Sequence, residues 1–373
     1  MIRILGIGLG AAFLFFLQRL VYQKYWNRRL EVQLRFVQPE IFEGESGSLQ
    51  EIIINAKRLP LHMLKVKFQA DKNLIFDAER GSRTTDLFYR NDIFQINGGE
   101  KITRTLSFTG GKRGFYQLKN IDLVGTDLFM SCRMYASCAA DAGIYVFPRP
   151  FRNEEFWRSL QQLNGEVLAK RHLLEDPFEY RGIREYQPFD DVRSINWKAT
   201  AKTDDLKVNQ KNNTTLRSIR IFLNIEDTGI LRKTECVEAC LQIGAGLSRF
   251  FLEQGMQVAC YCNGLDCLTS KPMEVAAGGG SGQLKAIYRS LARIDTQKPA
   301  VSFRDTFGEK LLKEAEGTVT CLAAPNQYPD FIALLERCRT EGMEFIWYYP
   351  VWERLSRQLP ASLEERIRIL PIL

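Results

Sequence analysis

The chain begins with a long apolar stretch. Residues 4–17 are all apolar or glycine, Gln18 and Arg19 interrupt the run, and residues 20–22 resume it. Together they supply about the 20 residues with which a helix crosses roughly 30 Å of hydrocarbon. The pattern therefore predicts a membrane-spanning helix over residues 4–22, and it makes the lipid bilayer the first expected partner.

The residues around this run favour an anchor that stays in the mature protein. Arg19 lies near one end, from which its side chain reaches the headgroups, and Tyr22, Tyr25 and Trp26 are expected to form an aromatic cluster at the membrane interface. The alternative is a cleaved signal peptide. Such a peptide has a basic segment before a shorter apolar core and an Ala-x-Ala-like site after it. Here only Arg3 precedes the run, and no Ala-x-Ala site follows it.

From residue 30 to residue 150 the hydrophobic pattern has the period of β-strands. Val32, Leu34 and Phe36 alternate with polar residues, and further short segments rich in β-branched and aromatic residues follow. Turn clusters that contain glycine separate these segments, and no long helical periodicity is present. These features predict an immunoglobulin-like β-sandwich.

The pattern changes twice in the second half of the chain. Residues 151–216 are mixed and strongly polar, and a helix is expected over Val192–Lys202 with Asp190 or Asp191 as its N-cap. Over residues 217–373 apolar strands alternate with helical segments, as in a parallel sheet covered by helices. The expected fold class is α+β multidomain, with an anchor over residues 1–29, a β-sandwich over 30–150, a connector over 151–216 and a Rossmann-like α/β domain over 217–373.

The charge balance supports the membrane and argues against nucleic acid. The 51 Lys and Arg residues exceed the 44 Asp and Glu residues by seven, but five basic and no acidic residues lie within residues 1–30. The remainder has an excess of only two, so no nucleic-acid partner is expected. Lys24, Arg28 and Arg29 follow the apolar run, and the positive-inside rule then places the long carboxyl-terminal part in the cytoplasm. Nine cysteines, an odd number, agree with that compartment.

A long motif lies within residues 178–202. It has an Arg-x-Tyr-x-Pro-x-Asp core, then Arg-x-Ile-x-Trp, then Ala-Lys. This motif resembles the signature of the family called domain of unknown function 58, with Phe189 in place of the usual Gly and Lys202 in place of the usual Arg. The residues that carry the resemblance, and that we take as candidate protein-binding or structural residues, are Arg184, Tyr186, Pro188, Asp190, Arg193, Trp197, Ala201 and Lys202.

The resemblance extends beyond the motif and implies a function. The segment from Lys112 to Leu118 and the following Asp127-Leu-Phe are similar to a hairpin and a turn of the family, and the part after Arg217 is similar to its von Willebrand A-like domain. The family works with MoxR-type AAA+ ATPases. The resemblance therefore implies a non-enzymatic adaptor or scaffold for such an ATPase in protein or complex maturation, held in a bacterial cell membrane. The family usually carries a pair of amino-terminal membrane helices, whereas this chain shows one, and the positive-inside rule places its soluble domains in the cytoplasm.

The motif itself allows two interpretations. Asp190 and Arg193 are spaced i,i+3 and are expected to pair on one helix face, and Arg193 and Trp197 are spaced i,i+4, which places a cation near an indole ring. One interpretation is a buried network that fixes the segment to the sheet. The other is a partner-binding surface with Arg184, Tyr186 and Trp197 as its anchors.

The remaining candidate chemistry is a divalent cation site. Von Willebrand A domains often bind a cation through Asp-x-Ser-x-Ser after the first strand, and here Asn224, Glu226 and Thr228 stand at those positions. No other cofactor is expected. A metal-dependent ligand- or protein-binding module with a degenerate site is thus the alternative function. Neither His62 nor His172 neighbours a marked nucleophile, so no enzyme is expected.

Overall fold

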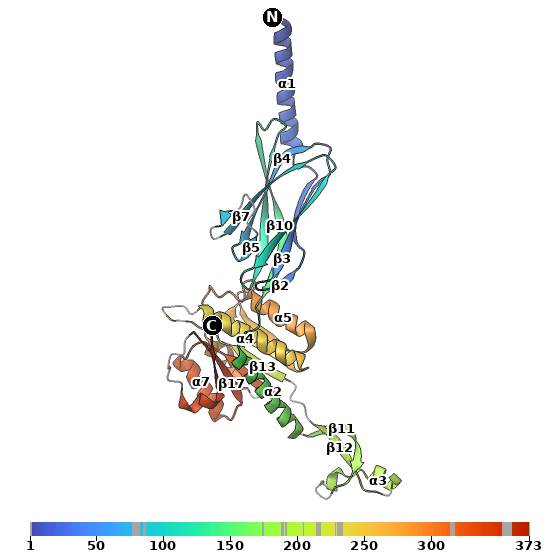
Figure 1. Cartoon of the computed structure of the whole chain (residues 1–373), viewed down its shortest axis with the longest axis vertical. Helices are drawn as coiled ribbons and strands as arrows, with labels where there is room; N and C mark the ends of the chain where they lie inside the picture. Colours follow the sequence, from blue (N-terminus) through green and yellow to red (C-terminus); the bar gives the residue numbers. More distant parts are fainter. Residues whose placement is uncertain are drawn as a thin grey trace. The chain divides into compact units, whose positions relative to one another are not determined.

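The computed structural model places the chain in two compact units, residues 1–149 and residues 150–373. The residues that the structure describes are 2–76, 83–84, 87–173, 175–187, 190, 192–203, 205–213, 218–227, 229, 234–313, 318–352 and 360–372. The fold is mixed, with a long amino-terminal helix and strand-rich first unit followed by an α/β second unit (Figure 1).

The first unit contains two β-sheets. Within each sheet most neighbouring strands pair in the antiparallel direction, and neighbouring strands are often distant in the sequence. The first sheet has the order β1 (Leu30–Phe36), β3 (Ser46–Asn55), β8 (Lys101–Gly110) and β5 (Leu74–Phe76). The second has the order β2 (Glu40–Phe42), β10 (Arg133–Phe147), β9 (Gly114–Thr126), β4 (Leu61–Asp71), β7 (Leu87–Ile96) and β6 (Arg83–Thr84).

The inner faces of the two sheets share one hydrophobic core. Along β1 and β3 every second side chain is buried, as the alternation in the sequence predicts. Phe76 of the first sheet meets Phe68 of the second, with ring centroids 6.4 Å apart, and also packs against Phe108. The predicted β-sandwich is therefore confirmed.

Helix α1 (Ile2–Tyr25) packs one face of its carboxyl-terminal half on the sandwich. Tyr22 and Trp26 are only 4% exposed, and the Tyr22 hydroxyl donates a hydrogen bond to the carbonyl of Pro60. Gly125 makes room for the indole, because a Cβ there would lie 2.5 Å from Trp26. The expected interfacial cluster is thus wrong for these two aromatic residues, which belong to the protein core, whereas Tyr25 is exposed.

Within the described part of the chain, α1 is the one helix long and apolar enough to cross a membrane. Its exposed side chains before Tyr22 are almost all apolar. This length and composition suit a membrane span or a signal sequence equally. The apolar helix that the sequence predicts is therefore present.

A cluster of charges is buried inside the sandwich. Glu51 is fully buried, and Asp92 accepts hydrogen bonds from Arg90 at 2.6 Å and Arg104 at 2.9 Å. Burial, together with the neighbouring carboxylate of Asp92, raises the pKa of Glu51 to about 7, although Arg104 and Arg90 act in the opposite direction. The core of this unit consequently contains a carboxyl group that keeps its proton to a much higher pH than an exposed glutamate does.

The second unit is built on one six-stranded sheet. Five neighbouring strands are parallel, and β15 joins the edge in the antiparallel direction. The order is β15 (Pro272–Gly278), β14 (Gln257–Leu265), β13 (Ser218–Leu223), β16 (Thr318–Ala323), β17 (Phe345–Val351) and β18 (Ile367–Pro371). This alternation of strands and helices is the arrangement that the sequence pattern predicts after residue 217.

Helices cover both faces of this sheet. On one face lie α4 (Thr234–Glu253) and α5 (Gly280–Arg293). The Tyr288 hydroxyl of α5 donates a hydrogen bond to the carbonyl of Ala245 in α4. On the other lie α6 (Phe303–Leu312) and α7 (Pro329–Thr340), which share a core with Phe222 and Trp347. A short 3-10 helix, η2 (Ala361–Arg366), precedes β18.

The first portion of the predicted connector packs on the six-stranded sheet and on α4. This portion forms α2 (Glu154–Leu173). Phe156 is fully buried against Tyr348 of the sheet, with ring centroids 5.5 Å apart, and a Cβ at Gly246 of α4 would lie 2.9 Å from the Phe156 ring. The second compact unit, which begins at Pro150, accordingly includes α2.

Candidate binding surface

The signature residues form a small module around a two-stranded sheet. Strands β11 (Glu175–Glu185) and β12 (Lys207–Asn213) pair in the antiparallel direction, and between them lie the 3-10 helix η1 (Val192–Ser194) and helix α3 (Trp197–Thr203). Figure 1 shows β11, β12 and α3 side by side, and these two strands form a sheet of their own. We call this group, residues 175–213, the signature module.

An ion pair between Arg184 and Asp190 organises the module. The guanidinium donates two hydrogen bonds to the two carboxylate oxygens, at 2.7 and 2.5 Å, and the backbone N–H of Gln187 donates a third at 2.8 Å. The hydrogen bonds from Arg184 and from the Gln187 backbone lower the pKa of Asp190. Asp190 itself lies in a bend before η1, and its expected pairing with Arg193 involves a side chain outside the described residues.

The expected helix over Val192–Lys202 is broken in the middle. Ile195 forms a bridge with Val208 of β12, and this places Asn196, instead of Asp190 or Asp191, at the start of α3. The Asn196 side chain accepts a hydrogen bond from the backbone N–H of Ala199 at 3.0 Å, in the manner of an N-cap. The sequence signal for this cap was present, since Asn is a preferred N-cap residue.

Large apolar side chains on the module are exposed. Helix α3 has no buried residue, and Trp197 at its start is 65% exposed. Ala201 and Lys202 are exposed as well. Among the described residues of the module, the other exposed large apolar side chains are Ile183, Val192 and Leu206. Our first interpretation, a buried network, is therefore wrong for Trp197, and the surface interpretation fits its position.

The signature residues are only partly brought together. Arg184 and Asp190 touch, and Tyr186 is half-buried, with its N–H bonded to the carbonyl of Leu206. Pro188 lies outside the described residues, as does the side chain of Arg193. From the sequence, Ile183, Val192 and Leu206 were given no role in binding, although apolar residues in a polar segment are a signal that would have marked them.

The candidate cation residues lie at the carboxyl edge of the six-stranded sheet. The strands β13 and β16 are neighbours, and the chain leaves them toward opposite faces of the sheet. Ligands bind at such a point in open α/β sheets. The Asn224 Oδ1 atom accepts hydrogen bonds from the Glu226 N–H and from Asn263 Nδ2, both at 3.0 Å. Asn326 Nδ2 donates to the Glu226 carbonyl at 2.8 Å. Asn263 and Asn326 are thus partners that the sequence did not mark, although both follow or end apolar strands.

This edge offers few oxygen atoms to a cation. Asn224 and Asn263 are almost fully buried and bond to each other, and burial raises the pKa of Glu226. Thr228 lies outside the described residues. Among the described residues no group of three His, Cys, Asp or Glu side chains is placed to hold a metal ion. The amide network holds the loop after β13 through hydrogen bonds to the backbone of Ile225 and Glu226.

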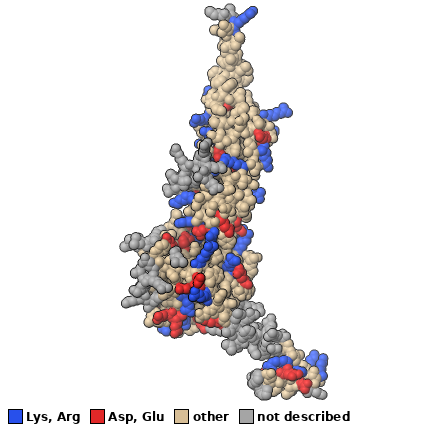
Figure 2. All heavy atoms as spheres, in the orientation of Figure 1, with Lys and Arg blue, Asp and Glu red and all other residues tan. Residues whose placement is uncertain are grey.

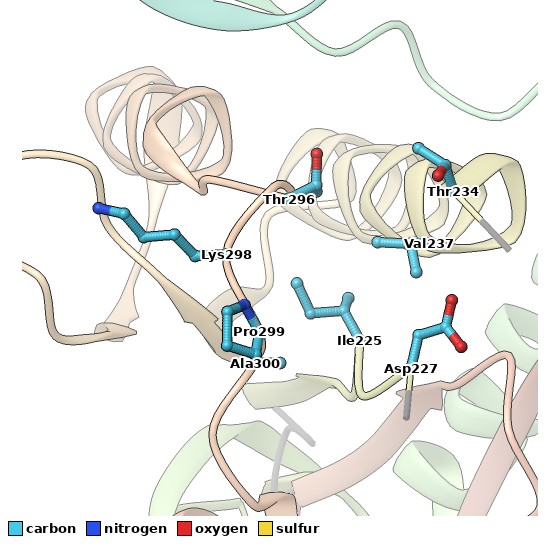
Figure 3. A pocket seen from close by; sticks show the side chains of 8 residues that line it. All are labelled: Ile225, Asp227, Thr234, Val237, Thr296, Lys298, Pro299 and Ala300. Atoms are coloured by element: carbon cyan, nitrogen blue, oxygen red, sulfur yellow. The ribbon is translucent and has the colours of Figure 1, made fainter. Parts of the chain in front are cut away.

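A small pocket lies beside this network. Its volume is about 30 Å³, which is room for about one water molecule. Figure 3 shows Ile225, Val237 and Pro299 around it, with the carboxylate of Asp227 at one side and the Lys298 side chain directed away. Its size does not suit an organic ligand.

Comparisons with known proteins add no family. No protein-family model matches the chain, and no curated protein matches it at a significant level. Solved structures that resemble part of it include a non-cellulosomal cohesin from Archaeoglobus fulgidus, with 10% identity over 31% of this chain and 91% of that one and a TM-score of 0.22. A CARDB domain from Pyrococcus furiosus has 11% identity over 31% of this chain and 90% of that one, with a TM-score of 0.20. These TM-scores are too low to support an argument about this chain.

Proposed function

We propose that the protein is a non-enzymatic adaptor, held in a bacterial cell membrane by α1, that presents its signature module to a MoxR-type AAA+ ATPase during protein or complex maturation. The resemblance of the signature motif to domain of unknown function 58, and of the second unit to a von Willebrand A-like domain, supports the identity of the partner. The observation that carries the proposal is the exposure of Trp197 on a module that the Arg184–Asp190 pair holds in shape.

The composition of the module supports a role in binding. Tryptophan is enriched among the residues that dominate the energy of protein interfaces. A two-stranded sheet has little core of its own. Among the described side chains of β11 and β12, Val208 is the one that is buried. Exposed Ile183, Val192 and Trp197 on so small a unit gain most when a partner covers them.

The membrane orientation follows from the same proposal. An AAA+ ATPase uses cytoplasmic ATP, so both units lie in the cytoplasm and the amino terminus lies outside. Lys24 and Arg28, just after the apolar run, are exposed at the end of α1, which agrees with the positive-inside rule.

Co-purification of the full chain with the ATPase tests the proposal. The two are co-expressed, solubilised in mild detergent and recovered through a tag on the chain. We expect Trp197→Ala to lower recovery of the ATPase at least tenfold, and Arg184→Ala to lower it as well. Trp352→Ala is the matched control, since Trp352 is 53% exposed in the same unit and lies outside the module. Equal recovery with Trp197→Ala, or no ATPase with the unaltered chain, overturns the proposal.

A further inference from the structure

An exposed apolar loop stands beside the membrane helix. It connects β9 and β10, and its tip consists of Leu128, Phe129 and Met130, which are 44%, 61% and 58% exposed. The Phe129 ring lies against Phe15 of α1, with ring centroids 5.7 Å apart. Figure 1 shows this hairpin end rising beside α1, on the side of the sandwich from which the helix emerges.

The loop is built to hold these side chains outward. The Asp127 carboxylate accepts hydrogen bonds from the Ser131 hydroxyl at 2.5 Å and from the Cys132 N–H at 3.0 Å. The Met130 N–H bonds to the Asp127 carbonyl, and Met130 adopts a φ of 55°, which is uncommon for a residue with a side chain. These contacts close a tight turn whose apolar residues face away from the core.

The length of α1 places this loop at membrane depth. Protein packs against the helix from Phe15 onward, through Gln18 and Tyr22. Residues 3–14 are therefore the helical stretch free of the sandwich, and they span only about 18 Å at 1.5 Å per residue. A bilayer has about 30 Å of hydrocarbon. A spanning α1 must consequently carry Phe15, and the adjacent Phe129, below the headgroups.

The charges nearby suit the same position. Arg19 follows Gln18 on the helix, Arg133 follows the loop, and Arg58 is exposed on the β3–β4 loop that also contacts Tyr22 through Pro60. Figure 2 shows Lys and Arg side chains around this end of the sandwich, below the apolar surface of α1. Lys and Arg at the headgroup level, with apolar residues beyond them, are typical of membrane-embedded protein.

We propose that the Leu128–Met130 loop is a second membrane contact, which enters the bilayer beside α1 from the same side. The inference rests on the membrane anchorage in the proposed function, and it adds a surface that the anchor alone does not require. The sandwich is then held against the lipid at two points, so that its orientation to the membrane depends on the loop as well as on α1.

Photocrosslinking to lipid tests this inference. The full chain is reconstituted in nanodiscs of phosphatidylethanolamine and phosphatidylglycerol, with benzoylphenylalanine in place of one residue, and lipid adducts are measured by mass spectrometry after illumination. The test position is Phe129. The positive control is Leu14, which is 64% exposed on α1, and the matched negative control is Ile75, which is 57% exposed in the same unit.

Ile75 is a suitable control because it lies at the far end of the sandwich. Ile75 pairs with Thr109, and Thr109 pairs with Ser46 at the start of β3. At the other end of β3, nine residues later, Asn55 pairs with Leu30, which follows the helix. That separation is about 30 Å.

We expect lipid adducts at positions 14 and 129 and at least fivefold fewer at position 75. If position 14 gives lipid adducts but position 129 gives no more than position 75, the inference is overturned and the anchor stays in place. No adducts at 14 would overturn the membrane anchorage itself. If the variant at 129 does not fold, as judged by its thermal unfolding, the same measurement at Leu128 decides the question.

Discussion

The side-chain amide of Gln18, in the apolar helix, donates a hydrogen bond of 2.9 Å to Oδ2 of Asp127, which lies 109 positions later in the chain. A polar residue within an apolar run is thereby paired with a fully buried carboxylate of the sandwich. Burial by itself raises the pKa of Asp127, but the hydrogen bonds from Gln18, Ser131 and the Cys132 backbone outweigh it and lower the pKa to about 2. One carboxylate thus ties the helix to the β9–β10 loop.

This pair predicts how the first unit responds to truncation. Asp127→Ala removes bonds to the helix and to the loop and is expected to lower the free energy of unfolding by about 2–4 kcal/mol, and Gln18→Ala by about 1–2 kcal/mol. Chemical unfolding in detergent measures both. Gln33→Ala, at an exposed position of β1, is the control and should change stability by less than 0.5 kcal/mol, roughly. Strict additivity in the double variant would contradict the contact.

The buried carboxyl of Glu51 predicts a pH dependence of stability. Its pKa rises from an ordinary 4.5 to about 7 in the folded state, so the folded sandwich holds a proton that the unfolded chain releases. The free energy of unfolding should therefore fall as pH rises from about 4.5 to about 7, by up to about 3 kcal/mol, and then level off. Glu51→Gln should remove this slope, whereas Glu31→Gln, at an exposed position, should keep it. A slope unchanged in Glu51→Gln would assign the effect to other groups.

The orientation of the chain in the membrane is testable through one thiol. Cys267 is exposed and can react with a thiol label. Cys262, which comes earlier on β14, is fully buried and cannot serve as the labelling site. An impermeant maleimide should label Cys267 only after lysis of the cells, because the proposed orientation places both units in the cytoplasm. Partial burial, with the carboxylate of Asp266, raises the pKa of this thiol, so labelling is best done near pH 8. Loss of the signal in Cys267→Ser identifies the site, and equal labelling of intact cells would reverse the orientation.

The carboxyl edge of the sheet is expected to bind no cation at micromolar concentration. The Asn224 oxygen already accepts two hydrogen bonds, and hard cations need several free oxygen ligands. Calorimetry of the full chain with magnesium, calcium and manganese should give only heats of dilution. Micromolar binding that Glu226→Ala abolishes, and that Glu253→Ala on the exposed face of α4 leaves intact, would instead favour the metal-dependent binding module.

The local pattern of the sequence determined the elements of both units. The apolar run predicts α1, the alternation in Val32, Leu34 and Phe36 predicts a half-buried strand, and the buried strands after residue 217 predict a parallel sheet. These features depend on residues a few positions apart, since the periods of helices and strands are short. The polar connector was misjudged because Phe156 and its neighbours are buried by α4 and the sheet, which are far away in sequence.

The tertiary structure alone decided which side chains meet. Nothing in the local sequence pairs Gln18 with Asp127, Arg184 with Asp190 across a turn, or Asn224 with Asn263 on the neighbouring strand. It also decided that Trp26 is in the core, where the sequence predicted an interfacial residue, and that Trp197 is exposed, which the sequence had left open between two interpretations. The physical reason is that burial of an aromatic side chain depends on the surface that folding brings to it, here the space left by Gly125, and the sequence around the residue does not contain that surface.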